Sequence, residues 1–137
     1  MRFLLIVLLA LVPIFSQSWG FFAHKRINQL AVFTLPPEMM IFYKQHIPYI
    51  TNNAVKPDMY LVKNEAPRHY IDLDVYGDSA VYKMPRYWNQ AVEQYSEDTL
   101  QAYGIVPFHV YRTSNWLIKA FQEKDVDKIL RISADLG

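Results

Sequence analysis

Apolar residues recur at helical spacing along most of this chain, and the alternation typical of strands is almost absent. Prolines punctuate the pattern, as at Pro36-Pro37, where one helix should end and the sequence PPEMMIFYKQHI should begin another. Only VYGDSAVYKM, with Gly77 at a turn, allows an extended loop or a hairpin. The other expected helices are Ala23–Leu35, Arg86–Ala102 closed by Gly104, Ile105–Phe121 with Pro107 in its first turn, and a last helix capped by Asp125. The sequence therefore predicts an all-α fold.

Two of these helices show an apolar face that should pack against the rest of the protein. The face of the last helix runs on to Gly137, where the sequence stops. Gly137 can be a simple helix cap. We favour the alternative that the fold is truncated at the C-terminus. The faces consist of Ile27, Leu30, Ala31 and Thr34 in the first helix, and of Val126, Ile129, Leu130 and Ala134 in the last.

The N-terminus has the parts of an export signal. Arg2 provides a positive charge, Phe3–Phe15 is an apolar run of 13 residues, and Ser16-Gln17-Ser18 places small residues where a signal peptidase cuts. A membrane span needs roughly 20 apolar residues, so this run disfavours the alternative of a retained anchor. We expect a signal peptide over residues 1–18, cleavage between Ser18 and Trp19, and a secreted or periplasmic protein.

Cleavage would leave residues 19–137, which we expect to be the N-terminal part of a single helical domain. Without Arg2, 13 basic residues balance 13 acidic ones, so the side chains have no net charge. The composition therefore does not suggest a basic surface that binds nucleic acid. The chain has no cysteine. An exported protein of this kind must be stabilised by core packing or by a bound metal, because disulfides cannot form.

The residue that cleavage would expose is itself a candidate metal ligand. An α-amino group has a pKa of about 7.7 to 8.0, so a metal can displace its proton near neutral pH. The amine and the carbonyl oxygen of Trp19 can close a five-membered chelate ring. His24 follows five residues later and reaches the same ion if a helix starts at Ala23. A single histidine near a helix start is also often structural, so the pair alone leaves both interpretations open.

Two further candidates follow prolines that stiffen the chain. Asp58 follows Pro57 and His69 lies two residues after Pro67, and zinc accepts both histidine nitrogen and aspartate oxygen. Asp72 or Asp74 could accept the proton of the other imidazole nitrogen and so orient His69. The alternative is that Asp58 caps a helix and Asp72 is a surface or capping carboxylate.

These residues carry a family resemblance. WGFFAH at 19–24, the Asp58 segment and RHYID at 68–72 resemble the zinc-dependent phospholipase C and single-strand-specific nuclease superfamily, notably its bacterial periplasmic members. The resemblance implies an all-α fold with up to three zinc ions in a cleft, which hydrolyses phosphodiester bonds. It implies that Trp19 and His24 bind one zinc ion, and that Asp58 and His69 bind a second.

The chain also departs from the family pattern. The family continues with a helix bearing His-x-x-x-Asp and with further ligands, and these do not occur here. His109 does not match that motif because Thr113 stands at the acidic position, so we expect His109 to be structural or to line a cleft. His46 should be a surface residue near a helix end. With two partial sites, residues 19–137 alone should be inactive.

The substrate class stays open between phospholipid and nucleic acid. Zinc charge would bind the phosphate, Arg68 could add a contact but more often forms a salt bridge, and Tyr60 and Tyr70 could stack on bases or touch lipid. No stable protein partner is implied. The alternative function is a non-catalytic exported helical binding or scaffold protein.

Overall fold

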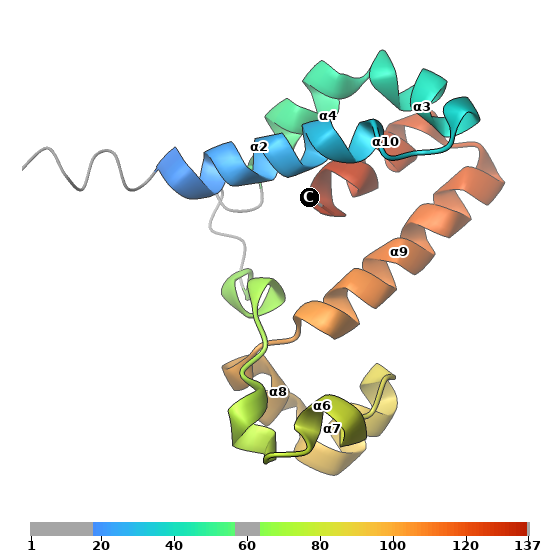
Figure 1. Cartoon of the computed structure of the whole chain (residues 1–137). Coiled ribbons are helices and arrows are strands. Elements are labelled where there is room, and N and C mark those ends of the chain that lie inside the picture. The colour runs from blue at the N-terminus through green and yellow to red at the C-terminus, as the bar shows by residue number, and fades with distance from the viewer. Residues whose placement is uncertain (1–17, 57–63, 137) are drawn as a thin grey trace, which may run out of the picture. The chain divides into compact units, whose positions relative to one another are not determined.

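The computed structural model describes residues 18–56 and 64–136, and all their regular secondary structure is helical (Figure 1). The prediction of an all-α fold is confirmed for these residues. They divide into two compact units, which we describe separately: unit 1, up to Lys56 and from Asp127 onward, and unit 2, up to Val126. Residues 1–17 of the predicted signal peptide, together with Asp58, Tyr60 and Gly137, lie outside the described residues. None of the described helices is both long and apolar enough to cross a bilayer.

Unit 1 contains four helices. They are α2 (Ser18–Val32), α3 (Pro37–Lys44), α4 (Ile47–Asn53) and α10 (Val126–Leu136), the last of which joins the unit from Asp127. Pro37 occupies the first turn of α3 as predicted, because its fixed φ suits a helix start and its missing N–H has no helical partner there. The expected start of the first helix at Ala23 is wrong, since α2 already begins at Ser18.

The buried side of α2 differs from the predicted one. Asn28 and Val32 are buried, whereas Ile27 and Leu30 are 54% and 48% exposed. The physical reason is a polar contact that periodicity of apolar residues does not reveal. The amide Nδ2 of Asn28 donates to the carbonyl oxygens of Ile50 at 3.4 Å and Ala134 at 3.0 Å, so this side of α2 faces α4 and α10.

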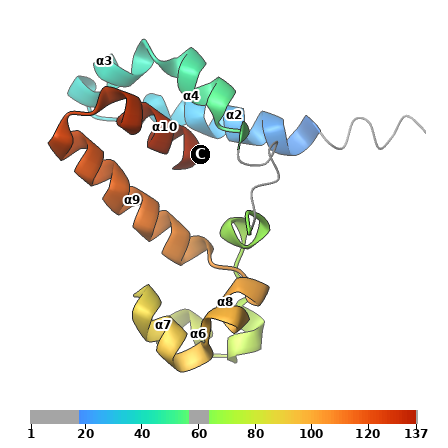
Figure 2. The same ribbon diagram turned by 180° about the vertical axis from the view of Figure 1, so that it is seen from behind.

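Helix α10 packs into unit 1 much as its sequence predicts. It begins directly after Asp125, and Ile129, Leu130 and Ala134 are buried. Val126 is 45% exposed, which corrects its place on the predicted face, while Ile132 is buried as well. Figure 2 shows α10 alongside α2 and α4. Besides the Asn28 bond, a hydrogen bond of 2.7 Å joins the hydroxyls of Tyr43 and Ser133, so α10 is tied to both α2 and α3.

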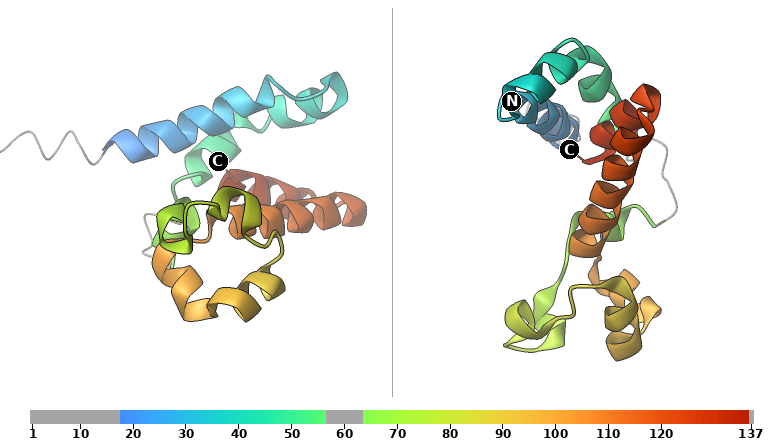
Figure 3. Two further views of the ribbon diagram at one scale, coloured as in Figure 1. Left: turned by 60° about the horizontal axis from the view of Figure 1, so that its bottom comes forward. Right: turned by 90° about the vertical axis from the view of Figure 1, so that its right-hand side faces the viewer.

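Unit 2 is a succession of short helices followed by a long one (Figure 3). The predicted helix Arg86–Ala102 is interrupted, because Ser96 adopts a φ of 67° and the hydroxyl of Ser96 accepts a bond from the Thr99 N–H at 3.3 Å, which caps a new helix. The helices are η1 (Ala66–His69), η2 (Leu73–Tyr76), α6 (Ala80–Lys83), α7 (Trp88–Tyr95), α8 (Glu97–Tyr103) and α9 (Val106–Glu123).

Two other predictions fall in this unit. The segment VYGDSAVYKM forms parts of η2 and α6, so the possible hairpin is wrong, although Gly77 does make a turn with a φ of 92°. Helix α9 confirms the prediction of a helix with Pro107 in its first turn. The core of unit 2 lies between α7, α8 and α9 and consists of Ala91, Leu100, Ile105 and Phe108.

Gly104 closes α8 as predicted and allows a close approach of two backbone segments. Its φ is 92°, and a Cβ atom at this position would collide with the carbonyl oxygen of Tyr70. The neighbouring residues use this proximity: Asp72 donates its N–H to Tyr103 at 2.7 Å, Ile105 to Pro67 at 2.6 Å, and Val106 to Tyr70 at 3.1 Å. The segment that carries His69 is therefore held on both sides by backbone hydrogen bonds.

Candidate functional site

The candidate site is centred on η1, which carries Arg68 and His69 directly after Glu65. Pro67 sits in the first turn of η1, and the Arg68 N–H donates to the Glu65 carbonyl at 2.9 Å. This short spacing brings the side chains of residues three and four positions apart to one side of the turn. Because the backbone hydrogen bonds to residues 103–106 hold the turn in place, its side chains start from a fixed base.

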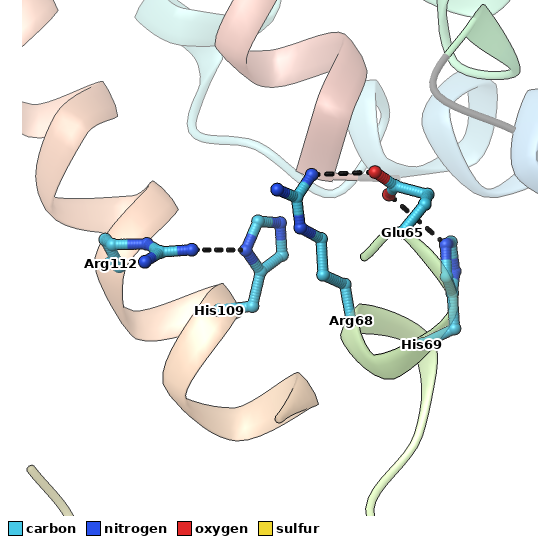
Figure 4. Close-up of polar contacts among 5 residues, drawn as sticks. All are labelled: Glu65, Arg68, His69, His109 and Arg112. Atoms are coloured by element: carbon cyan, nitrogen blue, oxygen red, sulfur yellow. Dashed lines mark hydrogen bonds and ion pairs between the residues drawn. The ribbon is translucent and has the colours of Figure 1, made fainter. Parts of the chain in front are cut away.

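Glu65 contacts both Arg68 and His69. Its Oε2 accepts a hydrogen bond from Arg68 Nη1 at 2.7 Å, and its Oε1 lies 3.4 Å from His69 Nε2 (Figure 4). The Glu65 side chain is only 13% exposed, compared with 40% for that of His69. The salt bridge expected for Arg68 is thus present, and the same carboxylate lies beside the imidazole of His69.

His109 and Arg112 lie one turn apart on α9 and contact each other. Arg112 Nη2 is 3.3 Å from His109 Nδ1. Since a guanidinium can only donate, Nδ1 is the acceptor and the proton of the neutral imidazole is on Nε2. The pKa of His109 is lowered, first by burial and then by the positive charges of Arg68 and Arg112. His109 is therefore the neutral member of a cluster that contains two arginines.

His109 and Arg112 also line a pocket of about 300 Å³ whose wall is largely aromatic. Of the two roles expected for His109, structural or cleft-lining, the structure supports the second. His46, in contrast, lies between α3 and α4 with its ring centroid 5.3 Å from that of Phe42, which agrees with its predicted place at a helix end.

The structure places the predicted zinc ligands in different parts of the chain. Trp19 and His24 belong to α2 of unit 1, whereas His69 belongs to η1 of unit 2. Asp58, the predicted partner of His69, and Tyr60 lie outside the described residues. The pairing of Asp58 with His69 therefore stays a prediction.

The helical state of Trp19 bears on its predicted role. Positions five apart in an α-helix are rotated by about 140° about the helix axis, so the backbone positions 19 and 24 do not lie on the same side of α2. A carbonyl group in the first turn is also directed toward the N–H four residues further on. Chelation by the amine and carbonyl of Trp19 together with His24 thus requires the first turn of α2 to open after cleavage.

Glu65 is a residue of the candidate site that the sequence reasoning missed. Asp72 or Asp74 is the residue expected to orient His69. Both are exposed, and Asp72, which precedes η2, makes no side-chain cap there. The carboxylate that reaches His69 is that of Glu65. The available signal was the spacing of Glu65 three residues before Arg68 and four before His69, a pattern that pairs side chains on a helical turn.

Tyr70 has structural contacts of its own. Its hydroxyl donates to the Ala102 carbonyl at 3.2 Å, and its own carbonyl accepts from Val106. The ring is 44% exposed, so a contact with substrate stays a prediction.

The fit to zinc is partial within the described residues. No group of three or more His, Cys, Asp or Glu side chains there converges as a metal site would require. His69 has suitable donor chemistry, because a carboxylate beside one ring nitrogen favours the tautomer in which the other nitrogen carries the lone pair. Comparisons with protein-family models, with curated proteins and with solved structures find no match to this chain.

Proposed function

We propose that this protein is a zinc-dependent phosphodiester hydrolase, of the phospholipase C or nuclease type, with Trp19, His24, Asp58 and His69 as ligands. The observation that carries the proposal is the Glu65 and His69 pair on η1. A carboxylate within 3.4 Å of Nε2 is the arrangement that orients metal-binding histidines in proteins. The resemblance of residues 19–24 and 68–72 to the zinc-dependent superfamily supports the same conclusion.

The residues of η1 have separable roles in this proposal. Glu65 holds the imidazole of His69 in one tautomer and one orientation, which preserves a lone pair on Nδ1. Bound zinc would supply Lewis acidity that polarises a phosphodiester oxygen toward attack by water. Arg68 uses Nη1 to donate to Glu65, and its remaining N–H groups can donate to a phosphate oxygen.

Removal of His69 tests the proposal directly. In the full-length exported protein, since residues 19–137 alone are expected to be inactive, His69→Ala should lose zinc, measured by elemental mass spectrometry, and should lose hydrolysis of bis(p-nitrophenyl) phosphate. His46→Ala is the matched control, because His46 lies at a helix end in unit 1 and belongs to neither predicted zinc site. Wild-type zinc content and turnover in His69→Ala would refute the assignment.

A second pair of variants tests which carboxylate orients His69. Glu65→Gln should lower zinc affinity and activity on the order of 10- to 100-fold, the usual cost of removing such a carboxylate. Asp72→Asn should have the smaller effect, since the structure pairs His69 with Glu65. Helical circular dichroism should be unchanged in both. The opposite order of the two variants would show that Asp72 takes this role.

Hydrolysis of a phosphatidylcholine substrate and of single-stranded nucleic acid by the same wild-type preparation would assign the substrate class.

A further inference from the structure

A pocket on unit 2 lies outside the predicted zinc ligands and has no role in the proposed hydrolysis. It lies between the beginning of α7 and the face of α9, and its volume is about 300 Å³. Five aromatic side chains line it: Tyr87, Trp88, Phe108, Tyr111 and Trp116. We call it the aromatic pocket.

Edge-to-face contacts hold the two helices of the aromatic pocket together. Trp88 and Phe108 have ring centroids 5.6 Å apart, and Tyr87 and Tyr111 have centroids 5.9 Å apart. Even so, Tyr87, Tyr111 and Trp116 are 55%, 54% and 49% exposed. Several half-exposed rings around one hollow are unusual on a protein surface, where such apolar area commonly marks a binding site.

Arg112 gives the aromatic pocket its charge. Its guanidinium lies 5.2 Å from the ring centroid of Trp116 and donates to His109. Arg68 is paired with Glu65, but Arg112 makes no ion pair with a carboxylate among the described residues. An aromatic pocket without a cation often binds a quaternary ammonium group. Here the guanidinium disfavours a cation and favours an anion.

We propose that the aromatic pocket binds a small planar aromatic group that carries an anion, with the ring stacked against its side chains and the anion paired with Arg112. Nucleoside monophosphates and aryl carboxylates share this chemistry. The inference is independent of zinc and of phosphodiester hydrolysis, because none of the residues involved is a predicted metal ligand.

The binding test compares probes that carry the ring, the anion or both. Calorimetric titration of the whole mature protein should give tighter binding of AMP than of adenosine or of inorganic phosphate. Benzoate, tested alongside, distinguishes an aryl carboxylate from a nucleotide as the preferred source of the ligand. Phosphocholine, which lacks a ring and carries a cation, should bind least. Equal affinity for AMP and adenosine, tighter binding of phosphocholine than of AMP, or failure of AMP and benzoate to bind at millimolar concentration would overturn the proposal.

Single substitutions test whether the ligand binds in the aromatic pocket. Arg112→Gln should weaken AMP binding roughly 10-fold or more, the loss expected for a charge-assisted hydrogen bond, and Trp116→Ala should weaken adenosine and AMP binding alike. Arg131→Gln removes an exposed arginine of α10 in unit 1 and should leave the affinity unchanged. His69→Ala should also leave it unchanged, which separates this pocket from the zinc site. Wild-type affinity in Arg112→Gln would refute the proposal.

His109 offers an independent readout. Arg112 contributes to the lowered pKa of His109, so an anion that pairs with Arg112 should raise this pKa toward its ordinary value. Proton NMR of the imidazole should show the rise with AMP and no rise with adenosine. A pKa unchanged at saturating AMP would place the anion elsewhere.

Discussion

Asn28→Ala is the substitution that should most selectively loosen unit 1. Asn28 is 5% exposed, and its Nδ2 bridges the carbonyl oxygens of Ile50 and Ala134, which are 22 and 106 residues away in the chain. The Ala134 carbonyl is one of the last four of α10, which have no partner within their own helix. Asn28 thus caps the end of α10 from another helix.

The magnitude follows from the two bonds. The 3.0 Å bond to Ala134 has good length, and its loss leaves a buried carbonyl without this partner, at a cost of about 1–3 kcal/mol. The 3.4 Å bond to Ile50 adds little, because that oxygen also accepts the Ala54 N–H at 3.1 Å. Alanine has a higher helix propensity than asparagine, which offsets up to about 0.7 kcal/mol of this loss. The expected net loss in free energy of unfolding is about 0.5–2.5 kcal/mol.

Asn52→Ala is the matched control. Asn52 is an exposed residue of α4, so the substitution brings a similar gain in helix propensity without removing a buried bond. Urea unfolding followed by circular dichroism measures the difference between the two variants, which should be about 1–3 kcal/mol. Hydrogen exchange of the 126–136 segment should accelerate in Asn28→Ala and stay unchanged in Asn52→Ala.

Equal stability of the two variants, with equal exchange in α10, would refute the reasoning. Asn28→Asp supplies a further check. A carboxylate cannot donate to two carbonyl oxygens and would be buried beside them, so this variant should be less stable than Asn28→Ala at neutral pH. A greater stability of Asn28→Asp would show that the bridging bonds are not made.

Three other predictions follow from local geometry and charge. Gly104→Ala should destabilise unit 2 by several kcal/mol, because the added Cβ would collide with Tyr70. Gly77→Ala has the same φ of 92° but open space around the Cβ, so it should cost only about 1–2 kcal/mol. Comparable losses of stability in urea unfolding would contradict the close approach of Gly104 to Tyr70. Ser96→Ala should lower the free energy of unfolding by about 1 kcal/mol, because it removes the cap of α8. Ser96→Gly should lower it less, because glycine tolerates a φ of 67°. The reverse order of the two variants would be inconsistent with both effects. The pKa of His109 is lowered in the folded state, so the unfolded chain binds more protons, and the free energy of unfolding should fall as pH drops from about 6.5 toward that lower pKa. His109→Gln should reduce the slope of stability against pH. An unchanged slope would assign the pH dependence to other groups.

Elements that depend on the chain's own local chemistry were predictable. Pro37 and Pro107 begin helices because the pyrrolidine ring sets φ and removes an N–H that would have no partner at a helix start. Gly77 and Gly104 occupy turns at positive φ, where glycine carries no steric penalty. Helical spacing of apolar residues was enough for the all-α class and for most of the buried face of α10.

The candidate site was only partly predictable. His69 and Arg68 stood out by residue type, and the ion pair of Arg68 was expected, whereas Glu65 was missed although its spacing to both residues signalled the contact. The metal role of Trp19, His24, Asp58 and His69 stays a prediction. Arg112 was missed because the sequence around it shows no motif, and its importance arises only from its contacts with Trp116 and His109.

The sequence by itself determined the helix starts at Pro37 and Pro107 and the turns at Gly77 and Gly104, because backbone dihedral preferences and missing N–H donors act within a few residues. Only the tertiary structure decided which side of α2 is buried, since Asn28 finds its carbonyl partners at Ile50 and Ala134. The break at Ser96 is local by contrast, because the Ser96 hydroxyl caps α8 through the Thr99 N–H three residues on, and the periodicity of apolar residues did not reveal it. Burial of a polar side chain is unfavourable unless it forms hydrogen bonds. For Asn28 the hydrogen-bond partners lie far away in the sequence, so local spacing cannot reveal them.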